Sequence, residues 1–341
     1  MSTKVLICDD SSMARRQMAR SLPASWPVEI TFAANGREGL SAIREGKGEF
    51  VFLDLNMPVM DGYKVLETLA AEGIETRVVV VSGDIQPEAR RRVMQLGALE
   101  FIKKPVDVVK IAELFGNLHL QRPPERRRDT RRVRPPPAGT RRPPAKLSPE
   151  QRDCYREIAN VAMGQAASLL ARVWDVFVLL PIPHVNMIEI SELQMALKAT
   201  EYDTVSTVCQ GFIGSGIAGE AVLFFHDFTF ADIARLMKYE GKIDKATEME
   251  LLMDVAGILI GACLKGIAEQ FDVPFGLGHP AVLGQHVPLE GLLTDGVAWR
   301  ETLAIEITYT IENYNVQCDL LILFTEESLD IMSHKIAYLL D

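Results

Sequence analysis

Five side chains suited to phosphate chemistry stand directly after short apolar runs in the first third of the chain. They are Asp9, Asp10, Asp54, Ser82 and Lys104. If the runs are parallel strands, their carboxyl ends meet at one sheet edge, where ligands of open α/β sheets bind. Asp54 alone could equally be a helix cap or a solvated loop residue, but its companions favour a common site.

Three carboxylates at one sheet edge define the chemistry of this predicted site. Packed together, they repel one another and raise one another's pKa. A hard divalent cation removes the repulsion, and an all-oxygen ligand set selects Mg²⁺. Lys104 adds an ammonium and Ser82 a hydroxyl. A carboxylate in these surroundings is suited to accept a phosphoryl group.

The apolar runs that position these residues alternate with helical stretches over the first 120 residues. We expect strands at 5–8, 28–33, 50–53, 78–81 and 99–102, and helices at 11–22, 35–44, 63–71, 87–96 and 107–118. Ser11 or Ser12 is the expected cap of the first helix. Five βα units of this length predict a doubly wound five-stranded parallel sheet.

Residues 3–120 resemble a response-regulator receiver domain of the CheY type, and we place that domain at 1–120. The residues that carry the resemblance are Asp9, Asp10, Asp54, Ser82, Lys104 and Pro105. The resemblance implies that Asp54 is the phosphoacceptor, with a histidine kinase as phosphodonor. It also implies that Lys104 binds the phosphoryl group, that Ser82 and Phe101 form a switch pair, and that the Lys104-Pro105 bond is cis.

The metal ligands follow from the same resemblance. Asp10, Asp54 and the main-chain carbonyl of Asn56 would hold Mg²⁺, with Asp9 contributing through a water molecule. Because every key position is filled, we expect a domain that is phosphorylated rather than an inactive relative.

Residues 121–147 are basic and rich in proline, so we expect an extended linker. The segment holds nine arginines and one lysine against Glu125 and Asp129, a local charge of +8. The chain has a net charge of −10, so the remainder carries −18, which argues against a nucleic-acid-binding body. We interpret the segment as a solvated spacer rather than a basic arm for nucleic acid or an acidic membrane, and expect no DNA partner.

Composition favours two globular domains in the cytoplasm. The 341 residues are 48% hydrophobic, enough for two cores. The five cysteines are scattered without a CxxC pair, which favours reduced thiols. No apolar run approaches the roughly 18 residues of a membrane span, and the chain enters a strand-like run at once, so we expect neither a membrane anchor nor a signal peptide.

Residues 148–341 contain two similar halves. Long helices are expected from Ser148 to about 174 and from about 246 to 271. At an offset of 97 residues the matched pairs are Glu157 with Asp254, Ala159 with Ala256, Gly164 with Gly261, Ala171 with Ala268, Asp175 with Asp272 and Pro183 with Pro280. One offset that matches glycines and prolines indicates an α+β domain made of two duplicated halves.

A polar stripe lies on the first of these helices. Asp153, Glu157 and Asn160 follow i, i+4, i+7 spacing and project from one face. A solvated helix face is the simplest interpretation of the spacing. The alternative is a functional face, since a carboxylate can pair with an ammonium in another protein's pocket and an amide can aim a water molecule.

With Pro183, this stripe resembles the signature of the CheC/CheX/FliY family of chemotaxis phosphatases, which dephosphorylate CheY-type receivers. The resemblance covers about residues 148–341. It implies that Glu157 contacts the receiver's active-site lysine and that Asn160 orients the water that attacks the aspartyl phosphate. In the second half Asp254 and Gly257 stand at these positions, and glycine has no side chain to hold a water, so we expect a single active site.

The whole chain is interpreted as a response regulator with a phosphatase output domain for CheY-type receivers, regulated by phosphorylation of Asp54. The substrate is its own receiver or another protein, and a homodimer is a further expectation. The alternative is a non-catalytic, phosphorylation-switched binding module in chemotaxis or motility signalling. The amide of Asn160 favours the enzyme, and glycine at the matching position 257 favours the binding module. We expect the receiver to cover the Glu157–Asn160 face until it is phosphorylated, rather than to be dephosphorylated there in cis.

Overall fold

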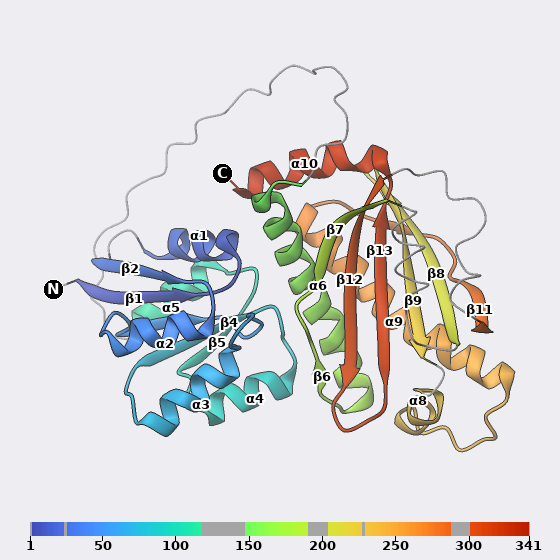
Figure 1. Ribbon diagram of the computed structural model, residues 1–341, viewed down its shortest axis with the longest axis horizontal. Helices are drawn as coiled ribbons and strands as arrows, with labels where there is room; N and C mark the ends of the chain where they lie inside the picture. The colour runs from blue at the N-terminus through green and yellow to red at the C-terminus, as the bar shows by residue number, and fades with distance from the viewer. Residues whose placement is uncertain are drawn as a thin grey trace.

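The N-terminal part of the chain is an open parallel sheet with helices on both faces (Figure 1). The structure is a computed structural model and describes residues 2–23, 26–117, 147–189, 204–226, 229–287 and 301–340. The strands are β1 (Thr3–Cys8), β2 (Val28–Ala33), β3 (Phe50–Leu53), β4 (Arg77–Ser82) and β5 (Glu100–Lys103). They pair in parallel in the order β2-β1-β3-β4-β5, which confirms the predicted doubly wound sheet.

Two layers of helices bury this sheet. Their bounds are α1 (Ser12–Ser21), α2 (Gly36–Arg44), α3 (Gly62–Glu72), α4 (Pro87–Gln95) and α5 (Val108–Asn117). Met18 of α1 and Ile111 of α5 belong to one core cluster. Leu40, Leu66 and Val93, from α2, α3 and α4, belong to the cluster on the opposite face. Strands covered on both sides read as continuous apolar runs, which is why they were visible in the sequence.

Local side-chain caps fix where the helices near the sheet's carboxyl edge begin. The Ser11 side chain accepts a hydrogen bond from the Ala14 amide, as predicted. Asn35 and Asp61 cap α2 and α3 in the same way. The Lys104-Pro105 peptide bond is cis, as the resemblance implied.

The C-terminal part is an antiparallel sheet with two long helices on one face (Figure 1). Its strands are β6 (Val178–Leu179), β7 (His184–Glu189), β8 (Val205–Gly214), β9 (Ile217–His226), β10 (Gly276–Leu277), β11 (Ala281–Val287), β12 (Glu301–Ile311) and β13 (Gln317–Phe324). Its helices are α6 (Pro149–Trp174), α8 (Phe230–Leu236), α9 (Lys245–Phe271) and α10 (Glu326–Leu340). The main path through the sheet is β10-β8-β9-β13-β12-β6.

The order of elements confirms the predicted duplication. Each half runs from a long helix through two short strands to a long hairpin and a final helix. The halves pair crosswise, because β6 and β7 join β12 while β10 and β11 join β8. Both long helices end at an aspartate in the left-handed conformation, Asp175 with φ 55° and Asp272 with φ 52°.

Helix α6 lies between the receiver-like part and the rest of the C-terminal part (Figure 1). One of its faces packs with α9 and the sheet in a common core that includes Ile158, Val255 and Leu259. By length and composition α9 could cross a membrane, but 61% of its most apolar window is buried inside the protein, as in a core helix. The predicted linker at 121–147 lies almost entirely outside the described residues.

Candidate functional site

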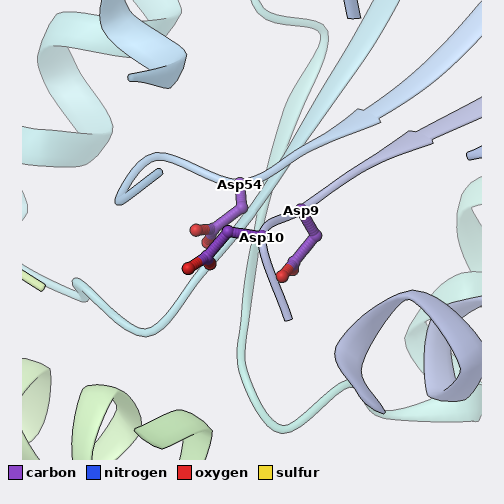
Figure 2. A group of neighbouring side chains, drawn as sticks. All are labelled: Asp9, Asp10 and Asp54. Atoms are coloured by element: carbon purple, nitrogen blue, oxygen red, sulfur yellow. The ribbon is translucent and has the colours of Figure 1, made fainter. Parts of the chain in front are cut away.

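Asp9, Asp10 and Asp54 meet at the carboxyl edge of the parallel sheet (Figure 2). Strands β1 and β3 are neighbours, and the Asp54 amide donates to the Cys8 carbonyl, so their ends lie side by side. One carboxylate oxygen from each aspartate lies within 4.8 Å of those of the other two. Burial raises the pKa of Asp54 well above its ordinary value; Asp9 and Glu157 raise it further, and Lys104 opposes them.

Lys104 is the positive centre of the site. Its Nζ lies 2.8 Å from Asp9 Oδ2, 3.2 Å from Asp54 Oδ1 and 3.0 Å from Glu157 Oε1. Burial alone would lower the pKa of Lys104, but the three carboxylates together raise it well above its usual value. The lysine is therefore charged and holds carboxylates from both parts of the chain.

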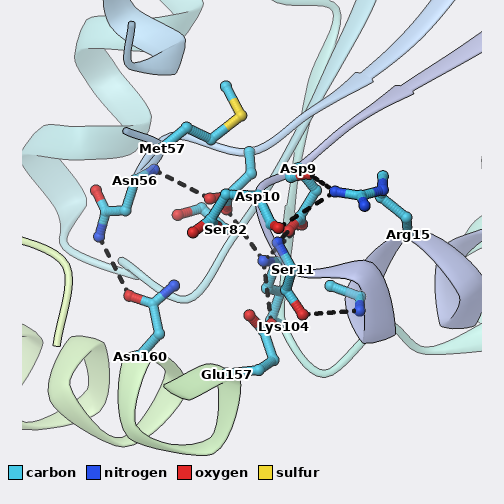
Figure 3. A network of polar contacts seen from close by, with 12 residues as sticks. Asp9, Asp10, Ser11, Arg15, Asn56, Met57, Ser82, Lys104, Glu157 and Asn160 are labelled. Carbon is cyan, nitrogen blue, oxygen red and sulfur yellow. Dashed lines mark hydrogen bonds and ion pairs between the residues drawn. The ribbon is translucent and has the colours of Figure 1, made fainter. Parts of the chain in front are cut away.

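Glu157 and Asn160 enter the site from α6 (Figure 3). Both are buried, so the polar stripe is not a solvated face. Burial raises the pKa of Glu157 to about 7, against the effect of Lys104. The Asn160 side-chain oxygen accepts a hydrogen bond from the side-chain Nδ2 of Asn56 at 3.4 Å. The main-chain N–H of Asn56 donates to Asp54 Oδ2 at 3.1 Å. Asn56 therefore links the side chain of Asn160 to Asp54 through two hydrogen bonds.

Two further residues of α6 reach the same site, and only one belonged to the predicted stripe. Asp153 Oδ2 accepts from the Ser12 hydroxyl at 2.7 Å and the Met13 amide at 3.0 Å, at the start of α1. Arg156, which the sequence reasoning missed, lies 3.2 Å from Asp10 and 3.1 Å from Asp153. The one signal in the sequence is its spacing: Arg156 follows Asp153 by three residues, a spacing at which opposite charges on a helix can pair.

The donor set fits a divalent metal ion. Asp10 Oδ2 and Asp54 Oδ1 are buried and accept no hydrogen bond within the described residues. They lie 3.2 Å from Arg156 and from Lys104, respectively. The three aspartates supply carboxylate oxygens close to one another, and these are the ligands that Mg²⁺ prefers.

The other predicted residues are placed as follows. Ser82 is buried at the end of β4, and its hydroxyl accepts from the Asp84 amide. Phe101 pairs with Val80 on the neighbouring strand and packs against the apolar core rather than in the polar cluster. Asp254 and Gly257 line a separate hollow on α9 of about 560 Å³. Asp254 and Gly257 are therefore not brought to the site that holds Glu157 and Asn160.

A cavity of about 210 Å³ lies beside the charged groups. Its lining includes Asp54, Lys104 and Glu157, the apolar side chains of Met13 and Val161, and Glu269 and Gln270 of α9. Its volume is large enough for several water molecules, since one needs roughly 10–15 Å³ of this kind of space. The site can thus hold water next to Asp54 while it remains covered by α6.

Comparison with known proteins identifies the N-terminal part. The response regulator receiver domain family matches residues 5–115. These residues form a receiver domain. A receiver domain is the part of a two-component system that accepts a phosphoryl group, and the general phosphodonor of such domains is a histidine kinase.

Relatives named as methylesterases match only this receiver region. Protein-glutamate methylesterase/protein-glutamine glutaminase 3 of Geobacter sulfurreducens is 35% identical over 119 residues, 34% of this chain and 32% of that protein. The corresponding protein 2 of Koribacter versatilis is 37% identical over 105 residues, 30% of this chain and 29% of that protein. The chain thus spans about a third of the length of these curated relatives.

Among solved structures, Thermotoga maritima FliY aligns with 56% of this chain and 98% of its own. The identity is 18% and the TM-score 0.44.

Proposed function

We propose that the C-terminal part of the chain is a phosphatase for the aspartyl phosphate of a receiver domain. The observation that carries the proposal is the 3.0 Å contact between Glu157 Oε1 and Lys104 Nζ. It joins α6 to Lys104, which also contacts Asp54, and it brings Asn160 next to the loop after Asp54. A water-holding amide beside an aspartyl phosphate is the group that hydrolysis needs.

In the proposed reaction the substrate is a phosphoryl group bonded to the phosphoacceptor carboxyl oxygen of a receiver, written here with the residues of this chain's receiver, Asp54 and Lys104. Lys104 pairs with the phosphoryl oxygens, and Glu157 fixes the lysine. Asn160 holds a water molecule in line with the bond to be broken. As the water oxygen bonds to phosphorus, the bond from phosphorus to the Asp54 oxygen breaks. The products are the free carboxylate, inorganic phosphate and one proton.

The protein's contribution is positioning, because a receiver already carries the charged groups that phosphoryl transfer requires. Asp10, Asp54 and the Asn56 carbonyl would hold Mg²⁺, with Asp9 assisting through water; when bound, the ion neutralises charge on the phosphoryl oxygens. We further propose that phosphorylation of Asp54 regulates the protein, since it adds a dianionic group where α6 contacts the receiver.

A non-catalytic role is the second candidate, and the extent of the contact between the receiver and α6 favours it. Contacts such as those of Asp153 with Ser12 and Met13 need no chemistry at Asn160. A binding module would keep these contacts and leave the lifetime of the phosphoryl group unaffected by α6.

The lifetime of phospho-Asp54 separates the two candidates. The full chain is labelled with acetyl phosphate and Mg²⁺, the donor is removed, and phosphate release is followed. Asn160→Ala should slow release on the order of a hundredfold, as loss of a positioning group does. The matched control is Gly257→Ala, because no described atom lies within 4 Å of a Cβ at that position. Equal lifetimes in wild type and Asn160→Ala, for this receiver and for a separate phosphorylated receiver, would rule out the phosphatase.

A further inference from the structure

The receiver also contacts the C-terminal part outside α6, at β6 and at the turn between β12 and β13. Gln86 is buried, and its side-chain amide donates to the Val178 carbonyl at 2.7 Å and accepts from the Val178 amide at 2.8 Å. The Gln86 side chain thus hydrogen-bonds the main-chain N–H and C=O of Val178, as a neighbouring strand would. The receiver therefore satisfies these main-chain groups of β6. This contact has no part in hydrolysis.

An ion pair holds the same side of the receiver. Both terminal nitrogens of Arg92 bond the two carboxylate oxygens of Glu312, at 3.0 and 2.5 Å. The guanidinium also lies over the Phe177 ring, 4.1 Å from its centre. Bidentate, stacked arginine contacts are specific in geometry, and a lysine could not replace this one.

Main chain packs against main chain where Gly164 of α6 meets Gly83 of the receiver. A Cβ built on Gly164 of α6 would lie 1.9 Å from the Gly83 carbonyl oxygen. Glycine is unfavourable within a helix, so its presence there fits a surface shaped for this loop. At the duplicated position, Gly261, the described residues leave open space within 4 Å. The face of α6, and not that of α9, is thus fitted to the receiver of the same chain.

The contacts surround the phosphoacceptor on two sides. Asp153 and Arg156 hold the start of α1 and Asp10, while the contacts of Gln86, Arg92 and Gly83 hold the other side. Glu157 and Asn160 contact Lys104 and Asn56 (Figure 3), and both of these residues contact Asp54 of the same chain. A separate receiver could reach these residues only after the chain's own receiver had left α6.

We infer that the substrate of this site is phospho-Asp54 of the same chain, so that the protein resets itself and does not act on other receivers while docked. The inference rests on the proposed phosphatase function. The sequence predicted that the receiver covers the Glu157–Asn160 face, and the docked arrangement agrees with this. The sequence analysis expected the covered face to be inactive, whereas we infer that hydrolysis takes place in the covered, docked state. Tethering keeps the phosphorylated group at roughly millimolar effective concentration, which favours the cis reaction over an encounter between chains.

The test mixes two full-length variants that complement each other only if the reaction occurs between chains. Asn160→Ala can be phosphorylated but lacks the water-holding amide. Asp54→Asn keeps the α6 residues but cannot be phosphorylated. The Asn160→Ala chain is labelled with radioactive acetyl phosphate, freed of donor, and incubated with a tenfold excess of the Asp54→Asn chain. Loss of label is compared with and without that excess.

We expect the added Asp54→Asn chain to leave the rate of loss unchanged, while labelled wild type loses its phosphoryl group on the order of a hundredfold faster. Wild type provides a test that does not depend on the folding of a variant. Its rate constant for loss of the phosphoryl group should stay the same over a hundredfold dilution. Acceleration by the added chain, or a rate that rises with wild-type concentration, would overturn the cis assignment and leave the phosphatase intact. Equal rates for labelled wild type and Asn160→Ala, with no effect of mixing, would instead refute the proposed function itself.

Discussion

The change Gly164→Ala tests whether close docking on α6 is needed for hydrolysis. The three nearest atoms to the added Cβ all belong to the receiver, at Gly83 and Asp84, and the closest is the Gly83 oxygen at 1.9 Å. Real Cβ contacts essentially never fall below 3.0 Å, so the backbones must separate by at least 1.1 Å, the difference between 3.0 and 1.9 Å. The obstacle is a main-chain carbonyl, which cannot rotate away as a side chain would.

A separation of this size is enough to disturb the site. The Glu157–Lys104 contact is 3.0 Å and the Asn160–Asn56 contact 3.4 Å, so a shift near 1 Å takes both out of hydrogen-bond range. Displacements of about 1 Å can cost roughly a hundredfold in rate. We therefore expect phospho-Asp54 of Gly164→Ala to persist about a hundredfold longer than that of wild type, with labelling by acetyl phosphate unchanged.

The duplicated half supplies the control. Gly261→Ala makes the same substitution at the matching position of α9, where the described residues leave open space. Alanine in place of a helical glycine stabilises by about 1 kcal/mol, which corresponds to a rise in Tm of about 2–4 °C for a domain of this size. Its phosphoryl lifetime should equal that of wild type. A Gly164→Ala chain with the wild-type lifetime would refute the requirement for close docking.

Three further outcomes are expected. Asp54→Ala should take up no acid-labile phosphate from acetyl phosphate and Mg²⁺, measured by radiolabelling; label that persists would contradict the assignment of the phosphoacceptor. Gly257→Ala should keep the wild-type phosphoryl lifetime while Asn160→Ala prolongs it; a similar prolongation in both would mean that α9 participates. Burial raises the pKa of Asp84 to about 6, so this group's contribution to the free energy of unfolding is fully present below about pH 3.8 and lost as pH rises through 6, roughly 3 kcal/mol in total. Asp84→Asn should remove that loss, and urea unfolding at pH 5 and 7.5 would show it as a smaller difference between the two pH values than in wild type.

The receiver could be read from the sequence because its information is local. Each strand such as Phe50–Leu53 is buried on both faces and appears as an unbroken apolar run. Each site residue follows such a run, so topology alone brings Asp9 and Asp54 together. The caps at Ser11 and Ser148 are equally local signals.

Docking of the two parts had no comparable signal. Arg92 and Glu312 are 220 residues apart, and each reads as an ordinary surface charge. Gln86 reads as the residue before a helix, although its amide bonds both main-chain groups of Val178. Gly164 was noticed, but only as evidence of duplication; its contact with Gly83 depends on how two separately folded surfaces meet. Pairings of this kind follow from shape and not from sequence pattern.

The loop after β4 connects the phosphorylation site to the docking surface. Ser82, at its start, lies beside the aspartates (Figure 3), Gly83 touches α6, and Gln86, at its end, bonds with Val178. A movement of Ser82 toward a phosphoryl group must shift Gly83, whose carbonyl has no spare room against Gly164. Because coupling between two equilibria is reciprocal, phosphorylation changes the free energy of docking by the amount that docking changes the free energy of phosphorylation. In the proposed cis reaction only the docked chain hydrolyses its phosphoryl group. The lifetime of the signal is then a property of this interface as much as of the residues that hold the water.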